Sequence, residues 1–150
     1  MLKLRLLPTY EELPYELLLL ADETVEAIDQ YVHQSDVYTA EMDDETIGVV
    51  CLYQVDAHTV EIKNMAIAEG YRGRGYGSLL LDSIKDITRK EYATLMVGTA
   101  DAGIRQIAFY EKNGFRKFAV KKNFFIDQYE APIYENGVQL KDMVILKFAL

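Results

Sequence analysis

Few residues in this sequence could carry redox, disulfide or metal chemistry. Among 150 residues there are one cysteine, Cys51, and two histidines, His33 and His58. One cysteine excludes an internal disulfide, and these three scattered side chains form no metal-ligand cluster. We therefore expect no metal cofactor, and the single thiol fits a reducing, cytoplasmic setting.

Long apolar runs are missing as well. No run approaches eighteen apolar residues, and residues 1–8, MLKLRLLP, are too short for the apolar region of a signal peptide. We expect neither a targeting segment nor a membrane partner.

Cations are scarce too. The chain has 16 lysines and arginines against 24 acidic residues, which gives a formal charge of −8. Nucleic-acid binding draws its affinity mainly from lysine and arginine on phosphates, so no nucleic acid is expected as a partner. An acidic surface favours cationic partners, although net charge by itself says nothing about chemistry.

The residues that are present suit one hydrophobic core. Half of the chain is apolar, which is sufficient for a single domain spanning residues 1–150. The expected assembly is a monomer or a homodimer.

Apolar periodicity predicts both strands and helices in the first half of the chain. Pro14 suits the first turn of a helix. Val25, Ile28 and Val32 recur at helical spacing after Asp22, which we expect to be the N-cap. Strands are expected at 3–7, 37–43, 46–56 and 59–68, the last three as an antiparallel meander.

A helix with Leu80, Leu81, Ile84 and Ile87 on one face should follow and cross over to a parallel strand at 93–98. A second helix is expected to begin at its cap Asp101 and to end at Gly114. Its apolar face is predicted from Ile104, Ile107, Ala108 and Glu111, with Tyr110 at the rim. A strand at 115–120, an irregular segment at 124–136, a hairpin turn at Asn136-Gly137 and a strand at 140–149 complete the chain.

The most informative stretch is 59–90, a strand and a helix joined by a turn that holds three glycines and two arginines. The start of a helix presents unpaired N–H groups and partial positive charge, which favour phosphate oxygens. Glycine allows close backbone approach to a diphosphate, and arginine adds charge. Such turns also close ordinary strand-helix units, so spacing must separate the possibilities.

Spacing excludes two phosphate-binding motifs. The turn has no lysine, which a P-loop requires, and Ser78 stands where a dinucleotide fingerprint needs its third glycine. What remains is Arg72-x-x-Gly75-x-Gly77 after the strand EIKNMAI at 61–67. This pattern resembles the acetyl-CoA-binding motif of the GNAT superfamily of N-acetyltransferases.

A second block resembles the same family. Residues 107–115, IAFYEKNGF, are similar to its helix that ends in Phe-Tyr-x-Lys-x-Gly-Phe. The resemblance extends from about residue 46 to the end of the chain. It implies an α/β (α+β) fold, with a mixed, mostly antiparallel sheet that has a central parallel strand pair and is flanked by helices.

The resemblance implies transfer of an acetyl group from acetyl-CoA, as co-substrate, to an amine. The strand would offer backbone groups to the pantetheine arm, and the glycine turn would hold the pyrophosphate. By position, the coenzyme contacts are Met65, Ala66, Ile67, Arg72, Gly73, Arg74, Gly75, Tyr76, Gly77, Ser78, Asp101 and Gly103. Many members of the family carry asparagine at the place of Gly103, and here that side chain is missing.

Two residues are expected to take part in the chemistry. Tyr110 matches the family tyrosine that faces the thioester sulfur and acts as a general acid. Glu61 matches the glutamate that some members use as a base, directly or through water. The alternative for Glu61 is a solvated, cross-strand paired residue without a catalytic role. A backbone N–H near Met65 is the expected oxyanion donor.

The acceptor is expected to be a small cationic amine. Residues 124–136, FFIDQYEAPIYEN, combine aromatic residues with three carboxylates and no cation. Glu130 and Glu135 would attract an ammonium group, and Tyr129 or Tyr134 would present a ring face to it. The alternative is that this segment only plugs the end of the sheet. Rival functions are a non-catalytic acyl-CoA-binding sensor and a protein or peptide N-acetyltransferase.

Overall fold

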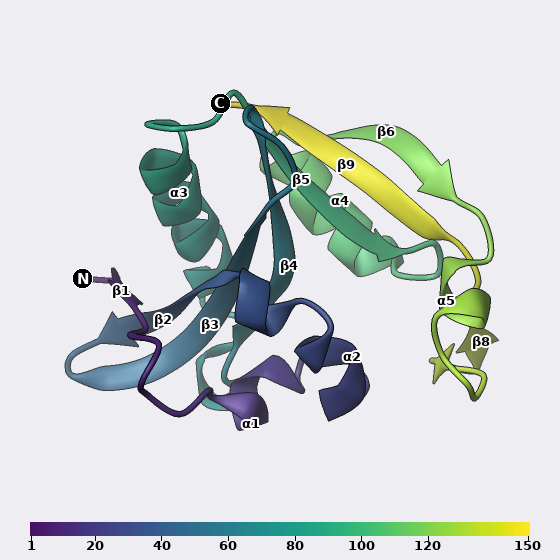
Figure 1. Cartoon of the computed structure of the whole chain (residues 1–150), viewed down its shortest axis with the longest axis horizontal. Coiled ribbons are helices and arrows are strands. Elements are labelled where there is room, and N and C mark those ends of the chain that lie inside the picture. Colours follow the sequence, from purple (N-terminus) through teal and green to yellow (C-terminus); the bar gives the residue numbers. More distant parts are fainter.

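Seven strands form one mixed sheet in the computed structural model, which describes all 150 residues (Figure 1). Their order in the sheet is β1-β2-β3-β4-β5-β9-β6. The strands are β1 (Lys3–Leu6), β2 (Asp36–Met42), β3 (Glu45–Gln54), β4 (Thr59–Ile67), β5 (Thr94–Ala100), β6 (Arg116–Lys121) and β9 (Met143–Ala149). The expected meander and the other strands of this sheet are confirmed.

Only β4 and β5 pair in parallel, and all other neighbours in the sheet are antiparallel. The connection between them runs through α3 (Tyr76–Thr88). A crossover helix was expected here because parallel strands cannot be joined by a tight turn. The predicted fold class, with a central parallel pair in a mixed sheet, is confirmed.

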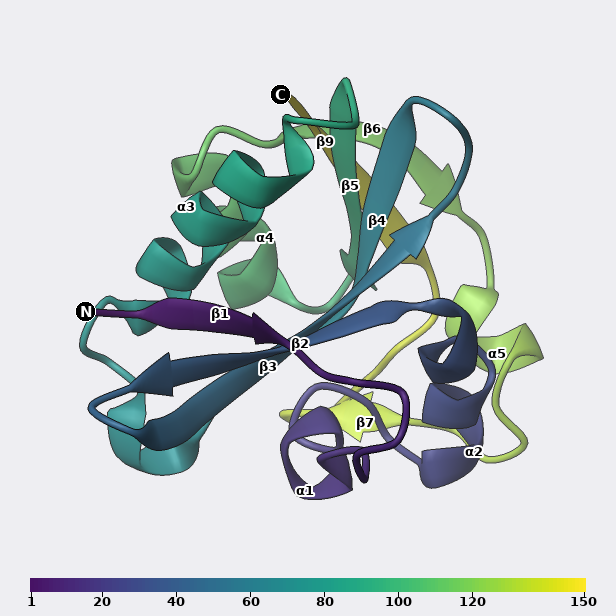
Figure 2. The same ribbon diagram turned by 60° about the vertical axis from the view of Figure 1, so that its left-hand side comes forward.

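Helices cover both faces of the sheet (Figure 2). On one face, α3 and α4 (Ile104–Lys112) pack on a cluster that includes Val50, Ile62 and Leu95. On the other, α1 (Tyr15–Leu18) and α2 (Val25–Asp29) pack on Val49 and Cys51. Neighbouring residues of β3 thus belong to different clusters, because side chains alternate between the faces of a strand.

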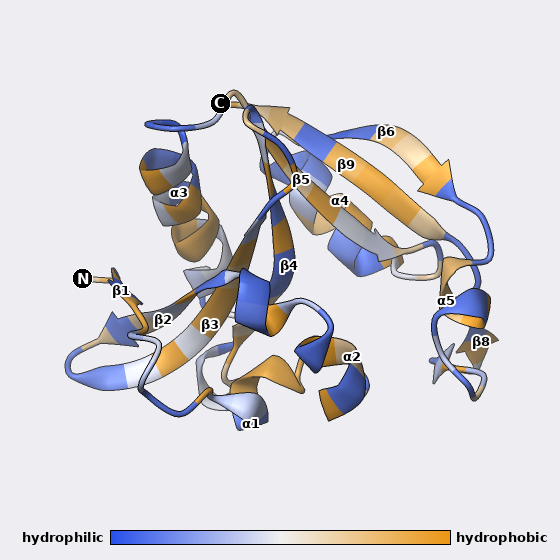
Figure 3. Ribbon diagram, viewed as in Figure 1, coloured by the Kyte–Doolittle hydropathy of each residue, from blue (hydrophilic) through white to orange (hydrophobic).

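α3 is amphipathic, with hydrophobic and hydrophilic residues side by side in Figure 3. Leu80, Leu81 and Ile84 are fully buried, as predicted, while Ile87 is only partly covered. Each buried side chain of this size contributes about 1.5 to 3 kcal/mol. This packing fixes the position of the glycine turn at the start of α3.

Two predicted helix caps are wrong. Thr24, not Asp22, is the N-cap of α2, and its hydroxyl accepts a hydrogen bond from Ala27 N–H at 3.1 Å. The helical stripe also breaks, because α2 ends at Asp29 and a 3₁₀ turn follows at Val32–Gln34. The N-cap of α4 is Gly103, so Asp101 is not its cap.

The predicted buried face of α4 is only partly right. Ile107 and Tyr110 are buried, whereas Ile104 is 76% exposed and Ala108 and Glu111 face solvent. The spacing of Gly103, Ile107 and Tyr110 is also helical, so the true face is the predicted one rotated by about one residue. Gly114 ends this segment in a left-handed conformation, as expected.

The segment after β6 is more regular than expected. It holds α5 (Phe124–Asp127) and a hairpin of β7 (Tyr134–Glu135) and β8 (Val138–Gln139). Asn136 and Gly137 both have positive φ, which confirms the predicted turn. The hairpin does not lead directly into the main sheet, however, because β7 and β8 pair only with each other.

No helix of the structure has the length and apolar character needed to cross a membrane.

Candidate active site

The parallel pair β4 and β5 separates along its length. Its pairing runs from Thr59 opposite Thr94 to Ile62 opposite Val97 and then stops. β4 continues to Ile67 and β5 to Ala100, and the two strands diverge (Figure 1). We call the facing unpaired edges, residues 63–67 and 98–100, the split. A bulge starts it, because Cys51 and Leu52 of β3 pair with Asn64 and Ile62 and leave Lys63 unmatched.

The split leaves free backbone groups on β4. Ala68 N–H donates to Ile47 O at 2.8 Å, which marks a hydrogen-bonded position of the β3–β4 ladder. Because an antiparallel ladder alternates, the backbone groups of Ala66 also face β3, while those of Met65 and Ile67 face the split. Backbone contacts to a ligand can thus come from both groups of Met65 and from the N–H of Ile67, whose carbonyl accepts a hydrogen bond from Arg72. Ala66 is directed away.

The glycine turn forms a cradle of unpaired donors. The six N–H groups of Gly73 to Ser78 donate to no atom of the chain, and the first helical bond of α3 is from Leu79 N–H to Gly75 O. Gly73 and Gly75 have φ values of 75° and 82°, which favour glycine. No side chain caps α3. Residues 73–78 therefore offer anion-binding geometry at a helix start.

The backbone N–H of Arg72 is not one of the free donors of the turn. Its N–H is already bonded to Glu69 O at 3.3 Å, so the cradle begins one residue later. Its side-chain Nε donates to Ile67 O at 3.2 Å, which ties the cradle to the end of β4. The exposed guanidinium of Arg74 lies 5.9 Å from the ring centre of Tyr71. Both arginines add positive charge beside the unpaired amides.

Tyr110 lies inside the core between α4 and the sheet. It is 8% exposed, and its ring meets those of Phe109 and Phe115 edge to face at 5.2 and 5.3 Å. Burial raises the pKa of its phenol above the ordinary value of 10, and no hydrogen bond contributes to this shift. The hydroxyl therefore stays protonated at neutral pH and remains available to donate to a ligand.

Glu61 lies on β4 just before the split, in the part that still pairs with β5. It pairs with Tyr53 on β3 and Met96 on β5. Its side chain is only 8% exposed, and its Oε1 lies 3.2 Å from Lys63 Nζ. One alternative for Glu61 was a solvated residue paired across strands. Its side chain is paired with Lys63 but is buried, so the expected solvation is wrong.

Glu61 and Tyr110 lie on opposite faces of the sheet. Val60 and Ile62 belong to the same cluster as Tyr110, under α3 and α4. Because strand side chains alternate, Glu61 points to the other face. The two candidate catalytic side chains thus lie on different sides of the sheet that contains the split.

Asp101 and Gly103 form the turn that enters α4. Asp101 Oδ1 accepts from Ala102 N–H at 3.0 Å and from Lys141 N–H at 3.4 Å. Gly103 N–H is bonded to Ala100 O at 2.9 Å, and a Cβ there would lie 3.0 Å from Gln106 Oε1. A larger residue at this position would therefore require these neighbours to shift slightly. A coenzyme contact of these two residues stays a prediction.

Tyr129 is hydrogen-bonded to a residue from the first part of the chain. Its hydroxyl donates to Asp22 Oδ1 at 2.9 Å, and Tyr31 donates to Asp22 Oδ2 at 2.9 Å. The Tyr129 ring stacks on Phe125 with centres 6.1 Å apart. Its ring and hydroxyl are therefore already engaged within the protein. Among the other predicted acceptor residues, Glu130 and Tyr134 are exposed and Glu135 is half-buried in β7.

The hydrogen-bond chain continues into the sheet. Asn64 Nδ2 donates to Tyr31 Oη at 3.0 Å and to Leu18 O at 2.9 Å. Asn64 follows the bulged Lys63, and its Oδ1 is a buried polar atom without a partner. The chain thus connects the segment after β6 to β4 beside the split.

We expect Tyr129→Phe to lower the free energy of unfolding by about 1 kcal/mol, because it removes one hydrogen bond to a carboxylate that keeps a second partner. Urea denaturation measures the loss. The matched control is Tyr134→Phe, whose side chain is 63% exposed and has no hydrogen-bond partner. Equal stabilities of the two variants would show that the Tyr129 contact does not hold this segment.

Cys51 is a buried core thiol. It is fully covered among apolar neighbours, and burial raises its pKa from 9 to about 12. A thiol that stays protonated is a poor nucleophile. Cys51 is therefore suited to core packing and not to nucleophilic chemistry.

Sequence reasoning missed Lys63, Asn64 and Tyr31, and it gave Asp22 a capping role. The two-residue spacing of Glu61 and Lys63 on a strand could have indicated the ion pair. Nothing in the sequence could have joined Tyr129 to Asp22, which are 107 residues apart.

Comparison with known proteins identifies the family of this chain. A model of the acetyltransferase (GNAT) family matches residues 5–115. A protein described as the uncharacterized N-acetyltransferase YvbK of Bacillus subtilis is 40% identical over 139 residues, which cover 92% of this chain and 89% of the relative.

Solved structures agree along the whole chain. A GNAT family acetyltransferase from Elizabethkingia anophelis, solved with acetyl-CoA bound, is 39% identical with a TM-score of 0.95, covering 99% of this chain and 98% of that one. An acetyltransferase from Bacillus subtilis, solved in complex with CoA, is 37% identical with a TM-score of 0.89, covering 100% and 99%. The chain with the split strands and the open amide cradle therefore belongs to the GNAT family of acetyltransferases.

Proposed function

We propose that this protein transfers an acetyl group from acetyl-CoA to a primary amine. The observation that carries the proposal is the row of six unpaired N–H groups at residues 73–78, next to the split. Two structures at 39% and 37% identity hold acetyl-CoA and CoA, which supports the same coenzyme here. The chemistry below is derived from the residues of this chain.

The residues fit a coenzyme with a diphosphate and an amide-containing arm. The cradle supplies donors for phosphate oxygens, and Arg72 and Arg74 supply charge. The backbone groups of Met65 and the free N–H of Ile67 can pair with the amides of the arm, as a strand edge pairs with an added strand. Acetyl-CoA brings an activated acyl group on a sulfur that leaves readily.

Met65 and Tyr110 would act on opposite ends of the thioester. The Met65 N–H, on the edge that faces the split, is our candidate donor to the oxygen that becomes negative. Tyr110 would donate to the departing sulfur. A CoA thiol has a pKa of about 8.5 if it behaves as an ordinary thiol, which is below that of the buried phenol. Tyr110 therefore serves as a hydrogen-bond donor, and complete proton transfer from it is uphill.

Glu61 is our candidate for receiving the proton of the attacking amine, directly or through one water. It points to the face opposite Tyr110 and lies beside the split. Lys63, 3.2 Å away, offsets the charge of the buried carboxylate. Attack is direct in this proposal, because the buried thiol of Cys51 offers no nucleophile for an acyl-enzyme.

The acceptor is, in this proposal, a small cationic amine. The carboxylates of Asp127, Glu130 and Glu135 lie on the segment after β6, and Asp22 adds a fourth through its bond with Tyr129. The net charge of −8 favours a cation in addition. Tyr134 keeps an exposed ring for a cation contact, whereas the Tyr129 ring is stacked on Phe125.

We expect Glu130→Gln combined with Glu135→Gln to raise the KM for the amine several-fold, because an ammonium loses two attracting charges. The CoA dissociation constant should stay unchanged. The matched control is Asp43→Asn with Asp44→Asn, at the β2–β3 turn on the far side of the molecule (Figure 1). Both positions have positive φ, which asparagine tolerates. Identical KM values for both pairs at low salt would assign the segment to packing alone.

A coenzyme-release assay against polyamines, aminoglycosides and peptides tests the function itself. Turnover with a cationic small amine supports the proposal, and preferred turnover of peptides supports the peptide N-acetyltransferase alternative. CoA binding without turnover of any amine would favour a non-catalytic sensor. The absence of a side chain at Gly103 is the observation that favours this last alternative.

A further inference from the structure

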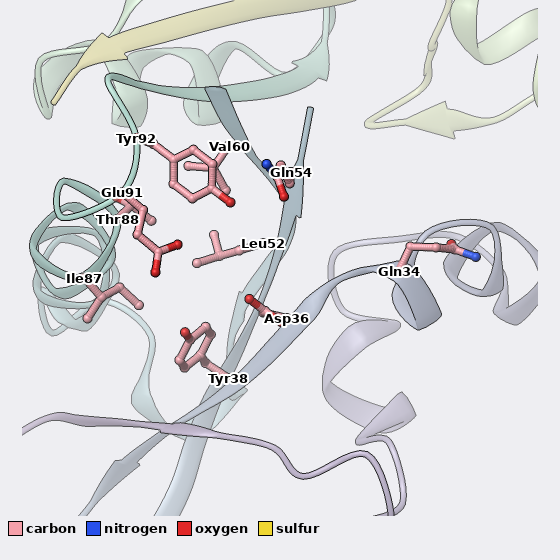
Figure 4. A pocket seen from close by; sticks show the side chains of 10 residues that line it. All are labelled: Gln34, Asp36, Tyr38, Leu52, Gln54, Val60, Ile87, Thr88, Glu91 and Tyr92. Atoms are coloured by element: carbon pink, nitrogen blue, oxygen red, sulfur yellow. The ribbon is translucent and has the colours of Figure 1, made fainter. Parts of the chain in front are cut away.

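A hollow of about 200 Å³ lies at the C-terminal end of α3 (Figure 4). Its floor is Leu52 of β3 and Val60 of β4, both nearly buried. Its walls include Tyr38 and Asp36 of β2 and Glu91 and Tyr92 of the turn after α3. The cradle is at the other end of this 13-residue helix, about 20 Å away at 1.5 Å per residue. The hollow is therefore separate from the candidate active site.

The hydroxyl of Thr88, which also lines the hollow, donates to Ile84 O at 2.7 Å, but the carboxylates and phenols of the hollow have no side-chain partners within the chain. The carboxylates of Asp36 and Glu91 form no ion pair, and the hydroxyls of Tyr38 and Tyr92 form no hydrogen bond. No lysine or arginine lines the hollow. It thus holds two negative charges that nothing in the lining compensates.

These four groups affect one another. Burial, followed by the charges of Asp36 and Glu91, raises the pKa of Tyr38. Burial, followed by the same two charges, raises the pKa of Tyr92. Carboxylates on β2 and on the turn after α3 therefore act on the same space, into which both rings project in Figure 4. Both phenols stay neutral and able to accept a hydrogen bond.

The chemistry of the lining selects a cation. Carboxylates attract it and repel anions, and the faces of tyrosine rings attract it as well. The C-terminal end of α3 adds partial negative charge. The apolar floor of Leu52 and Val60 suits a short alkyl chain. The volume lies below the range of about 300 to 1,000 Å³ that holds drug-sized ligands, so the ligand must be small.

We propose that this hollow binds a small primary alkylammonium ion at a second site, separate from the site of acetyl transfer. A primary ammonium offers three N–H donors to the carboxylate and phenol oxygens. A quaternary ammonium offers none and could use only the rings and the charge. The preference between the two kinds of ion therefore separates a built site from mere attraction to an acidic surface.

The experiment is a titration of the full chain, saturated with CoA, with 1-aminobutane, followed by backbone amide NMR shifts. We expect residues 34–38 and 88–92 to shift with one dissociation constant. Asp36→Asn combined with Glu91→Gln should weaken binding at least tenfold. The Asp43→Asn and Asp44→Asn pair removes the same charge elsewhere and should keep the parent affinity. Tetramethylammonium should bind several-fold more weakly than 1-aminobutane.

Two results would overturn the proposal. One is that shifts occur only around the split and the segment after β6, and the other is that the two double variants bind alike. Asp36 and Glu91 are exposed and their replacements are isosteric, so folding should be kept. Glu91→Gln alone, with an expected threefold loss, covers the case in which the double variant does not fold. Binding is measured without turnover, so the outcome is independent of whether the protein acetylates amines.

Discussion

CoA should raise the melting temperature of the parent protein, and Gly75→Val combined with Gly77→Val should abolish that rise. A ligand at one hundred times its dissociation constant stabilises the folded state by about 2.7 kcal/mol, or roughly 5 to 10 °C for a chain of this size. Valine at 75 is incompatible with a φ of 82° and reshapes the cradle. Valine at 77 meets the Phe109 ring, which is already 3.4 Å from a Cβ built there. Thermal unfolding with and without CoA measures the effect.

Loss of binding must be separated from backbone strain. Gly137, at the tip of the β7–β8 hairpin, has a φ of 79° and open space around it, as Gly75 has. Gly137→Val should therefore lower the melting temperature without CoA about as much as Gly75→Val, and only Gly75→Val should lose the response to CoA. An unchanged CoA response in the Gly75 and Gly77 double variant would show that the turn is purely structural.

The sequence predicted the sheet well because its strands and turns have local signatures. Residues 59–68 alternate, the glycine turn interrupts them, and the next helix buries Leu80, Leu81 and Ile84 as its spacing requires. Asn136-Gly137 forms the expected turn because both residues tolerate positive φ. Structural features that depend on residues close together in the sequence can thus be predicted from the sequence.

The failures occur where two local solutions are nearly equal. α4 has nine residues, so both the predicted stripe and the true one contain only a few positions, and the apolar Ile104 favoured the wrong one. Asp22 and Thr24 are both good N-caps. Tertiary contacts decided between them, because Asp22 accepts the hydroxyls of Tyr31 and Tyr129.

The geometry of the candidate coenzyme cradle was more predictable than the contacts of the candidate acceptor segment for the same reason. The cradle at 73–78 is one contiguous turn whose free amides follow from its glycines and from the helix start. The candidate acceptor segment, after β6, is joined to the loop before α2 through Asp22 and Tyr129. Such contacts depend on the packing of the whole sheet, and residue type alone gives no spacing rule for them.

Tyr110→Phe should lower kcat about a hundredfold and leave the CoA dissociation constant nearly unchanged, since loss of one donor to a reacting group has this usual scale. Phenylalanine keeps the ring contacts with Phe109 and Phe115, so the fold should be kept. Single-turnover kinetics with an active amine measures the chemical step. Tyr10→Phe, at a residue that is 86% exposed, is the control and should behave like the parent.

The pH dependence provides a second test of the same residue. Because burial raises the pKa of Tyr110 above 10, the donor form persists through pH 10, and the parent should show no loss of kcat from this group between pH 7 and that limit. An alkaline fall in kcat that is present in the parent and absent in Tyr110→Phe would mean that the phenol ionises earlier than its burial requires. A Tyr110→Phe variant with parental single-turnover rates would remove Tyr110 from the mechanism. The hydrogen bond to the departing sulfur would then have to come from solvent or from another group of the chain, and the burial of Tyr110 would be explained by packing alone.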